Sequence, residues 1–218
     1  GCGWPSFDDE ISGAIVRYED SSLGRIRTEI CCSKCDGHLG HVFLGEEITL
    51  KNTRHCVNSL SIQFKPYDNL EEAIFGGGSF WKLDKIFRSL KGVYLSSTGY
   101  MGGDVINPTY EQVCNGKTNH TEVVQIYFDP KEIGYKDLLL AFFKNHNPTS
   151  VNDQHKYLYT HHRSVVFYKT EEQKKTIFLI KDTIQKEYKK DIITQILPSV
   201  NFYRAEEYHQ KYIDRNSL

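Results

Sequence analysis

The pattern of apolar residues changes near Pro66, and this change divides the chain into two parts with different secondary structure. Before Pro66, three short and mostly alternating segments, 14–18, 25–30 and 56–64, are separated by Gly, Asp and Asn and predict strands. After it, strands alternate with helices. The sequence therefore predicts two modules: a small all-β module over residues 1–66, and an α+β two-layer module over residues 70–218.

The second module contains a glycine-rich turn, Gly76 to Gly78, after a short apolar segment. Apolar residues then recur at helical spacing from residue 80, so Ser79 is the expected N-cap of a helix over 80–90. Further strands are expected at 123–128, 163–168 and 192–197, and further helices at 135–145, 171–190 and 204–215.

Composition excludes several classes of protein. The chain of 218 residues has a net charge of −1 and 25% charged residues, which argues against disorder and against a polybasic nucleic-acid arm. Its longest apolar run, from Leu138 to Phe143, is far shorter than the roughly 20 residues of a membrane-spanning helix. Neither a membrane nor a nucleic acid is expected as a partner. Residues 1–10 show no secretory signal, and a cytoplasmic location is expected.

The cysteines are concentrated at the start of the chain, because five of the six precede residue 57. Cys32 and Cys35 form a CxxC, which indicates metal or redox chemistry in a chain without a secretory signal. His38 and His41 follow, so a Cys2His2 zinc site is chemically conceivable, although the spacing is shorter than in ordinary zinc sites. Two buried thiols in a turn are the alternative.

Cys56 lies in an expected strand two residues after Arg54. A cationic neighbour lowers the pKa of a thiol and increases the fraction of the nucleophilic thiolate. Taken alone, however, a cysteine in a strand is more often a small buried apolar residue than a nucleophile. Cys2, with Trp4 close behind it, gains a role only if it can reach Cys56.

Three motifs of the first module occur in a recognisable order. Residues 1–7 (GCGWPSF), 32–43 (CSKCDGHLGHVF) and 54–59 (RHCVNS) resemble the successive signatures of the R-specific methionine sulfoxide reductase, MsrB. The resemblance implies that Cys56 attacks the sulfoxide sulfur and becomes a sulfenic acid, that Cys2 resolves it as a disulfide, and that thioredoxin reduces the disulfide. It also implies that Trp4 holds the substrate methyl group. The remaining residues assigned to the site are His38, His41, Arg54 and Asn58.

The same resemblance bears on zinc. The family's structural zinc uses two CxxC pairs, and Cys32 and Cys35 match only the second pair. Half of the zinc site is therefore expected here, with the other half upstream of Gly1 in a longer protein. No organic cofactor is expected.

The turn at 76–81 has several generic interpretations. A glycine-rich turn before a helix favours anions, but the Lys and Ser/Thr of a P-loop are missing. A hydrolase nucleophile elbow requires Gly two residues after Ser, where Trp81 stands. An N-cap alone would explain Ser79.

The wider pattern favours another interpretation. Six ordered segments resemble the S-specific methionine sulfoxide reductase, MsrA: 78–81, 99–103, 107–111, 119–124, 145–149 and 205–210. The chain thus resembles a fusion of the two enzymes, with the B type first. Ser79 occupies the position of the nucleophilic Cys. The resemblance assigns Phe80 and Trp81 to the methyl pocket, Glu122 to protonation of the sulfoxide oxygen, and Tyr110 to a hydroxyl contact.

Two further positions differ from the MsrA pattern, with Tyr157 in place of an Asp and His162 in place of a Tyr. Serine is un-ionised near neutral pH and has no accessible sulfenic state, so reduction of S-sulfoxides is predicted to be weak or absent. A metal cluster of His155, His161 and His162 is one hypothesis and a solvated loop is another. Cys114 is expected to be a buried thiol.

The sequence therefore predicts a peptide methionine sulfoxide reductase acting on oxidised proteins or free methionine sulfoxide, with thioredoxin as reductant. The rival predictions are a module that binds methionine sulfoxide without reducing it, and an inactive fragment.

Overall fold

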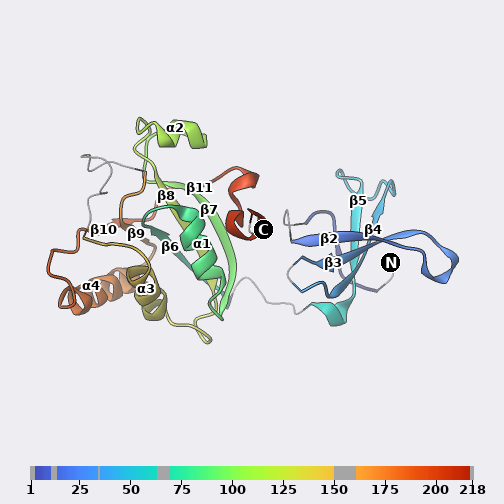
Figure 1. The fold of residues 1–218 in the computed structure, drawn as a ribbon, viewed down its shortest axis with the longest axis horizontal. Helices are drawn as coiled ribbons and strands as arrows, with labels where there is room; N and C mark the ends of the chain where they lie inside the picture. The colour runs from blue at the N-terminus through green and yellow to red at the C-terminus, as the bar shows by residue number, and fades with distance from the viewer. Residues whose placement is uncertain (1–2, 11–13, 34, 63–68, 150–160, 217–218) are drawn as a thin grey trace. The chain divides into compact units, whose positions relative to one another are not determined.

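The computed structural model describes residues 3–10, 14–33, 35–62, 69–149 and 161–216. The chain forms two compact units, residues 1–66 and residues 67–218, and each is described by itself (Figure 1). None of the described helices is long and apolar enough to cross a membrane.

The N-terminal unit is built on one antiparallel sheet of five strands, in the order β1-β5-β4-β3-β2. Strands β2 to β5 follow one another as a meander (Figure 1), and β1 pairs with the outer edge of β5. The strands are β1 (Ser6–Phe7), β2 (Ile15–Asp20), β3 (Arg27–Cys32), β4 (His38–Leu44) and β5 (Thr53–Val57).

The structure confirms the all-β class and the strands expected near 14–18 and 25–30, each displaced by one or two residues. The strand expected over 56–64 is wrong in its position, because β5 ends at Val57 and a 3₁₀ turn, Ser59–Ser61, follows. The physical reason is a local cap: the Asn58 side chain accepts a hydrogen bond from the backbone N–H of Leu60 at 3.0 Å.

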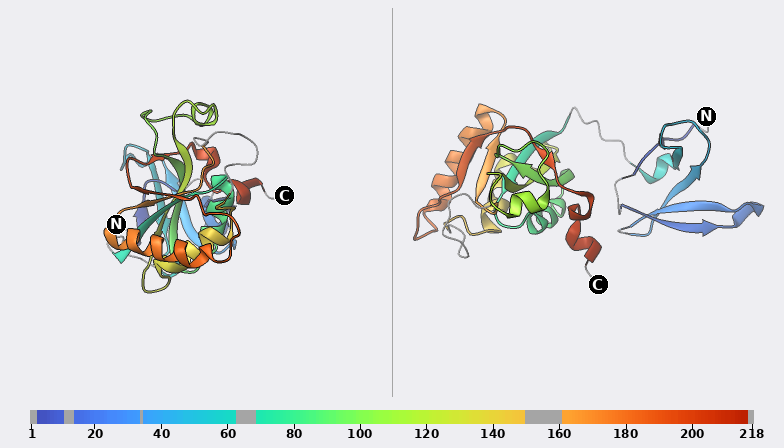
Figure 2. Two further views of the ribbon diagram at one scale, coloured as in Figure 1. Left: turned by 90° about the vertical axis from the view of Figure 1, so that its left-hand side faces the viewer. Right: turned by 90° about the horizontal axis from the view of Figure 1, so that it is seen from above.

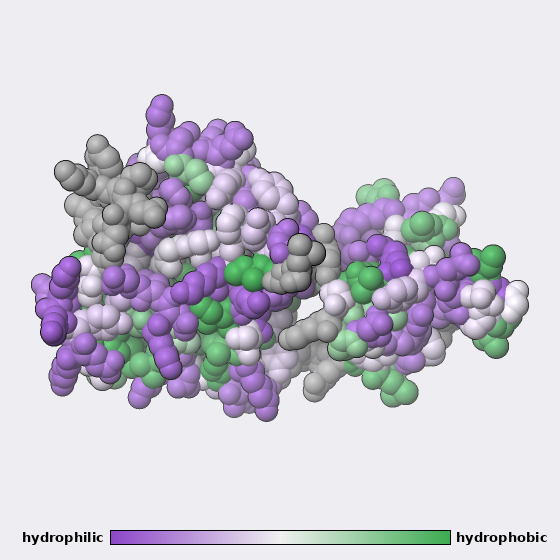
Figure 3. Space-filling view, viewed as in Figure 1, coloured by the Kyte–Doolittle hydropathy of each residue, from purple (hydrophilic) through white to green (hydrophobic). Residues whose placement is uncertain are grey.

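The core of this unit is small. Ile30, Val42 and Val57 form its buried cluster, with Ile15 and Leu39 packed against them. Several large apolar side chains are exposed instead, among them Leu44, Ile48, Leu50 and Leu60. Figure 3 shows the hydrophobic residues of this unit in separate groups among hydrophilic ones.

The C-terminal unit contains a six-stranded sheet in the order β10-β9-β6-β8-β7-β11. The β10–β9 pair is parallel and the other pairs are antiparallel. The strands are β6 (Glu71–Gly76), β7 (Val93–Met101), β8 (Thr121–Phe128), β9 (Val165–Tyr168), β10 (Gln195–Pro198) and β11 (Tyr203–Arg204).

Helices cover one face of this sheet, as the α+β class predicts. Figures 1 and 2 show α3 and α4 side by side, and the face of α4 seen in Figure 3 is mostly hydrophilic. Strand β6 contributes Phe75 to the main core under the helices and Ile74 to a smaller core on the opposite face, as alternation along a strand requires. The helices are α1 (Phe80–Arg88), α2 (Tyr110–Cys114), α3 (Tyr135–Lys144), α4 (Glu171–Gln185) and α5 (Tyr212–Asn216).

The helix expected over 204–215 is wrong in its start, because only its last turn is α-helical. Tyr203–Arg204 pairs with β7 as a strand, a 3₁₀ turn spans Glu207–His209, and the helix begins at Tyr212. The Gln210 side chain explains the interruption, because it accepts from the Thr98 N–H and donates to the Thr98 carbonyl, both at 3.0 Å. These bonds hold the segment against β7. The expected helix over 171–190 is confirmed but ends at Gln185.

Candidate functional site

Cys56 lies on a row of residues that crosses the whole N-terminal sheet. The pairing register places Ser6 opposite Cys56, Cys56 opposite His41, His41 opposite Glu29, and Glu29 opposite Tyr18. Residues directly opposite one another in paired strands share a face of the sheet. The thiol, an imidazole and a carboxyl group are therefore neighbours on one face.

Arg54 precedes Cys56 by two residues on β5 and so lies on the same face. Its guanidinium donates to both carboxylate oxygens of Glu46, at 2.6 and 2.9 Å, and lies 4.5 Å above the ring of Phe43. Glu46 and, more weakly, the Cys56 side chain raise the pKa of Arg54 above its ordinary value. A permanent cation thus stands beside the thiol of Cys56, a residue that is 8% exposed, and a cation in this position favours the thiolate.

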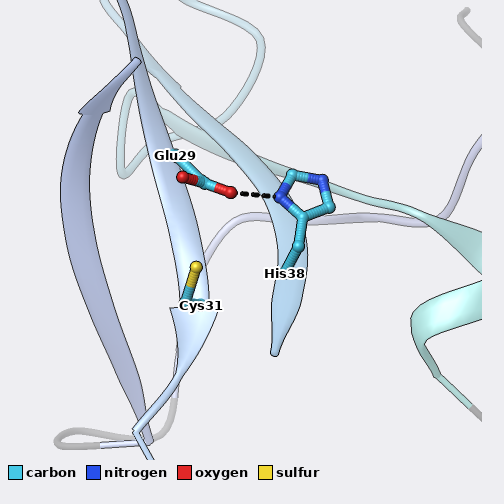
Figure 4. A group of neighbouring side chains, drawn as sticks. All are labelled: Glu29, Cys31 and His38. Atoms are coloured by element: carbon cyan, nitrogen blue, oxygen red, sulfur yellow. Dashed lines mark hydrogen bonds and ion pairs between the residues drawn. The ribbon is translucent and has the colours of Figure 1, made fainter. Parts of the chain in front are cut away.

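Both predicted site histidines are held by carboxylates. His38 Nδ1 lies 2.5 Å from a carboxylate oxygen of Glu29, and His41 Nε2 lies 2.8 Å from one of Asp20. Figure 4 shows the Glu29 carboxylate directed at the His38 ring, with the Cys31 thiol on the same strand as Glu29. The two imidazoles are in edge contact, with ring centroids 5.6 Å apart. Each ring is therefore oriented by an acid.

The CxxC lies at the turn between β3 and β4. Cys32 N–H donates to the Gly37 carbonyl at 2.9 Å, and Cys35 is exposed. Within the ranges that the structure describes, no metal-binding group of three side chains includes Cys32 or Cys35. The Cys2His2 hypothesis is not realised among these residues, because no group of metal-binding side chains joins the two cysteines with His38 and His41. The described residues offer zinc two thiols and no complete tetrahedral set, so they do not fit the metal by themselves.

Trp4 and Asn58 complete the described residues assigned to the first site. The Trp4 side chain is half exposed, and the Asn58 side chain caps the 3₁₀ turn that follows β5. Cys2 lies outside the described residues. Its part as the resolving thiol stays a prediction.

In the second unit, Ser79 stands where strand β6 passes into helix α1. It is the N-cap residue, as predicted, with extended backbone (φ −63°, ψ 128°), but its hydroxyl makes no capping hydrogen bond. The turn before it is tightly packed, since a Cβ on Gly77 would lie 2.8 Å from the ring of His146. The side chain at position 79 is therefore held at the positive end of a helix and is not used in capping it.

Glu122 is the buried acid of this site, with 1% of its surface exposed. Its Oε2 accepts a hydrogen bond from the backbone N–H of Phe80 at 3.0 Å. His162 Nε2 lies 3.2 Å from Oε1, a distance suited to an ion pair, but no hydrogen bond of acceptable geometry reaches this atom from any described residue. One carboxylate oxygen is thus fixed to the helix, and the other is buried and receives no hydrogen bond from a described residue.

The two histidines beside Glu122 are positioned through their backbone. The His161 carbonyl accepts from the Glu122 N–H at 2.7 Å and from Thr121 Oγ1 at 2.8 Å, and the His162 carbonyl accepts from the Gly78 N–H at 3.0 Å. Their rings lie in contact, with centroids 4.1 Å apart. His162 therefore lies at the carboxyl group, whereas Tyr157 and His155 fall outside the described residues.

Aromatic side chains surround the start of helix α1. Phe80 is fully buried, and its ring lies near those of Trp81 and Tyr110, with centroids 6.0 and 6.3 Å away. His209 was not predicted for the site, yet its ring lies 4.3 Å from that of Tyr110 and its Nδ1 accepts from Trp81 Nε1 at 3.1 Å. Burial raises the pKa of Tyr110 and lowers that of His209. The segment 205–210 carried the only sequence signal for His209.

Cys114 differs from its prediction as a buried thiol. It is partly exposed at the end of α2, and it interacts with the Tyr110 hydroxyl. Its sulfur, a carboxylate oxygen of Glu122 and an imidazole nitrogen of His161 all lie within 4.8 Å of one another. Sequence spacing does not reveal this group, because the three residues come from different elements.

The structure thus holds two candidate sites of an enzyme in two separate units. The first has a thiol beside a cation and an acid-bound histidine, and the second has a serine near a buried acid and aromatic rings. Comparison with known proteins identifies the class of enzyme. Residues 71–218 match the family described as peptide methionine sulfoxide reductase, and residues 1–66 match the SelR domain. The chain belongs to the peptide methionine sulfoxide reductase family, as a fusion of a SelR (MsrB) domain with an MsrA domain.

Individual relatives agree with this assignment. The peptide methionine sulfoxide reductase MsrA of Methanosarcina acetivorans is 43% identical over 176 residues, which cover 80% of this chain and 94% of that protein. The crystal structure of reduced Mxr1 from Saccharomyces cerevisiae aligns with a TM-score of 0.64 at 32% identity, covering 72% of this chain and 90% of that one. Methionine sulfoxide reductase A of Corynebacterium diphtheriae aligns with a TM-score of 0.61 at 28% identity, covering 72% and 79%.

Proposed function

We propose that the N-terminal unit reduces the R-sulfoxide of methionine, free or within oxidised proteins, with Cys56 as nucleophile. The observation that carries this proposal is the row that sets Cys56 beside His41, with Glu29 on the other side of His41 and the Arg54 guanidinium next to the sulfur. A cation next to a thiol favours the attacking thiolate, and oriented imidazoles are suited to proton transfer.

The reaction proceeds in two steps at the protein. The Cys56 sulfur takes the sulfoxide oxygen and becomes a sulfenic acid, while the substrate leaves as the thioether. His38 and His41 supply protons to the oxygen as it is transferred, each oriented by its carboxylate partner. The Cys2 thiol then attacks the Cys56 sulfur, which forms a disulfide and releases water. Trp4 contacts the substrate methyl group.

A dithiol reductant regenerates the two thiols by disulfide exchange. Thioredoxin is the proposed reductant. The related Mxr1 from Saccharomyces cerevisiae has been solved in complex with Trx2, and that structure aligns with this chain with a TM-score of 0.50 at 27% identity. A cytoplasmic location stays a prediction.

The C-terminal unit is proposed to bind the S-sulfoxide and to leave it unreduced. Ser79 cannot supply a thiolate, whereas the aromatic residues Phe80, Trp81 and Tyr110 still surround the start of α1. The buried Oε1 of Glu122, which accepts no hydrogen bond from a described residue, favours this second function. A protonated Glu122 would donate from this oxygen to a bound sulfoxide.

A stereospecific assay tests the first proposal. The full chain is given dithiothreitol and, separately, the R- and S-sulfoxides of a blocked methionine, and the thioether product is measured. We expect turnover of the R-sulfoxide alone, its loss in Cys56→Ser, and its retention in Cys114→Ser, a matched thiol substitution in the other unit. Turnover of the R-sulfoxide that survives Cys56→Ser would overturn the assignment of the nucleophile.

The second proposal is tested by calorimetric titration of the Cys56→Ser chain with an S-sulfoxide peptide. Saturable binding without thioether product is expected, weakened by Trp81→Ala. The matched peptide with unoxidised methionine serves as the control. Equal heats from both peptides would contradict recognition of the sulfoxide.

A further inference from the structure

Three side chains of the second unit bring different metal-binding atoms together. Any two of Cys114 Sγ, a Glu122 carboxylate oxygen and a His161 ring nitrogen lie within 4.8 Å. Zinc bonded to thiolate, carboxylate and imidazole holds neighbouring ligand atoms about 3.3–3.6 Å apart. Adjustments of about 1 Å by these side chains would therefore enclose a cation. We propose that this group, defined by Cys114, Glu122 and His161, binds a divalent transition-metal ion, with zinc the best match.

The chemistry of the three ligands selects the metal. A thiolate favours zinc and other soft or borderline ions over magnesium and calcium, and imidazole favours the same group. With a thiolate and a carboxylate, the protein supplies two negative charges, which balance a divalent cation held between partly buried ligands. Three protein ligands leave one tetrahedral position open for water.

Glu122 provides the second, independent observation. Its side chain is 1% exposed, and its Oε1 receives no hydrogen bond of acceptable geometry from the described residues. A buried carboxylate oxygen without a donor costs about 1–3 kcal/mol, and more when charged. We assign Oε1 as the Glu122 ligand atom, because Oε2 is already bound to the N–H of Phe80. A cation at Oε1 would remove this penalty, and His162 Nε2 at 3.2 Å would then lie beside the coordinated oxygen.

The backbone around the group is firmly placed. Glu122 lies in the paired strand β8, and its second carboxylate oxygen is bound to the N–H of Phe80. The His161 carbonyl accepts hydrogen bonds from the Thr121 hydroxyl and the Glu122 N–H, both in strand β8. Cys114 ends α2, whose start carries a complete capping box at Thr109. Ligand side chains on anchored backbone lose less freedom when a metal binds.

The proposed metal would compete with the sulfoxide for Glu122, since both use the same buried oxygen. Metal binding is nevertheless independent of reduction at Cys56. A failure of either proposal can therefore be told from a failure of the other.

Cobalt(II) is the probe, because a thiolate bonded to it gives a strong near-ultraviolet charge-transfer band. The full chain carrying Cys31→Ser, Cys32→Ser and Cys35→Ser is titrated with cobalt(II). These changes remove the CxxC thiols and the thiol that lies near Glu29 and His38. We expect one equivalent bound with this band, loss of the band on adding Cys114→Ser, and affinity at least about tenfold weaker on adding His161→Gln. A band that persists unchanged in Cys114→Ser would overturn the proposal.

A second measurement needs no substitution in the pocket. The unaltered, reduced chain is treated with iodoacetamide with and without zinc(II), and the alkylation of each cysteine is read by peptide mass spectrometry. Zinc is expected to slow the alkylation of Cys114 at least about tenfold. Equal rates at Cys114 with and without zinc would reject the site. The R-sulfoxide assay on a portion of the protein that has not been alkylated reports the first unit separately.

Discussion

Oε2 of Glu122 accepts a hydrogen bond from the backbone N–H of Phe80 at 3.0 Å, which joins the middle of the C-terminal sheet to the first turn of α1. The N–H groups of a first helical turn have no partner within the helix, so an acid at this point satisfies one and is stabilised by the helix dipole. The acid is thereby held beside the residue that follows Ser79. The chemistry of this unit therefore depends on the side chain at position 79 and on the group that faces the other oxygen of Glu122, Oε1.

The first prediction concerns Ser79→Cys. A thiol at this N-cap position should be reactive, because the helix dipole favours the thiolate. Turnover of the S-sulfoxide is nevertheless expected to stay at background, since the His162 ring lies 3.2 Å from the Glu122 oxygen that would protonate the substrate. Product formation from the S-sulfoxide is the measurement. Recovery by Ser79→Cys alone would show that only the nucleophile had been lost.

The companion variant separates the two defects. Adding His162→Tyr to Ser79→Cys is expected to raise S-sulfoxide turnover at least about tenfold over Ser79→Cys, because general acid catalysis typically contributes 10² or more. His162→Tyr alone is the control and should stay inactive. A double variant no faster than Ser79→Cys would contradict the part assigned to His162.

The second prediction concerns Arg54→Lys. Lysine keeps the charge but cannot bind both oxygens of Glu46, so the cation would no longer be held beside Cys56. The kcat/KM for the R-sulfoxide is expected to fall about tenfold or more, equivalent to about 1.4 kcal/mol. Arg25→Lys, on the same unit and outside the site, is the control. Unchanged kcat/KM in Arg54→Lys would argue against an electrostatic role.

The third prediction concerns Gly40→Ala. A Cβ at Gly40 would lie 2.0 Å from the carbonyl oxygen of Cys56. No choice of rotamer relieves this clash, because a Cβ has a fixed position on the backbone. We expect a loss of about 3 kcal/mol or more, because strands β4 and β5 must separate. Gly45→Ala, at φ +78° with open space around its Cβ, should lose only about 1 kcal/mol. Hydrogen exchange of the β5 amides measures both, and equal exchange in the two variants would contradict the clash.

The fourth prediction concerns pH. Burial lowers the pKa of His146 from 6.5 to about 4, and its ring nitrogens bind the Phe142 carbonyl and the Ser164 hydroxyl at 2.8 and 2.7 Å. The unfolded chain takes up this proton first as pH falls. Stability of the C-terminal unit should therefore be full above about pH 6.5 and decline toward pH 4, by up to about 3 kcal/mol.

Thermal melts between pH 7.5 and 4.5 test this, with His146→Gln as the matched variant. The variant should show a smaller decrease in Tm. Some decrease should persist, because burial also lowers the pKa of His209. Identical pH profiles for the two proteins would remove His146 as the cause.

Local patterns predicted the elements whose apolar spacing is regular. The helix that begins at Phe80 and the strand that ends at Phe128 are confirmed. Each has one continuously buried face, which leaves a regular apolar pattern in the sequence. Strand β7 was not predicted, since its sequence is rich in Ser, Thr and Gly, and its place between β8 and β11 comes from pairing. The closing helix was mispredicted because Gln210 bonds to a residue 112 positions away.

The sites divide in the same way. Residues inside short motifs, such as Cys56 with Arg54, could be named from sequence. The row through Cys56, His41 and Glu29 required the strand register. Cys114, Glu122 and His161 come together only when three separate segments of the chain fold against one another. Their spacing in the sequence therefore does not predict the group.

Positions 161 and 162 are fastened by their carbonyl groups, through the N–H groups of Gly78 and Glu122 and the hydroxyl of Thr121. Main-chain bonds of this kind do not depend on which side chain the residue carries. Evolution, or a designer, can therefore exchange both side chains without moving the carboxyl group or the helix beside it. The C-terminal unit is therefore a scaffold in which the side chains at positions 161 and 162 can change the reactivity of the site while the surrounding fold stays the same.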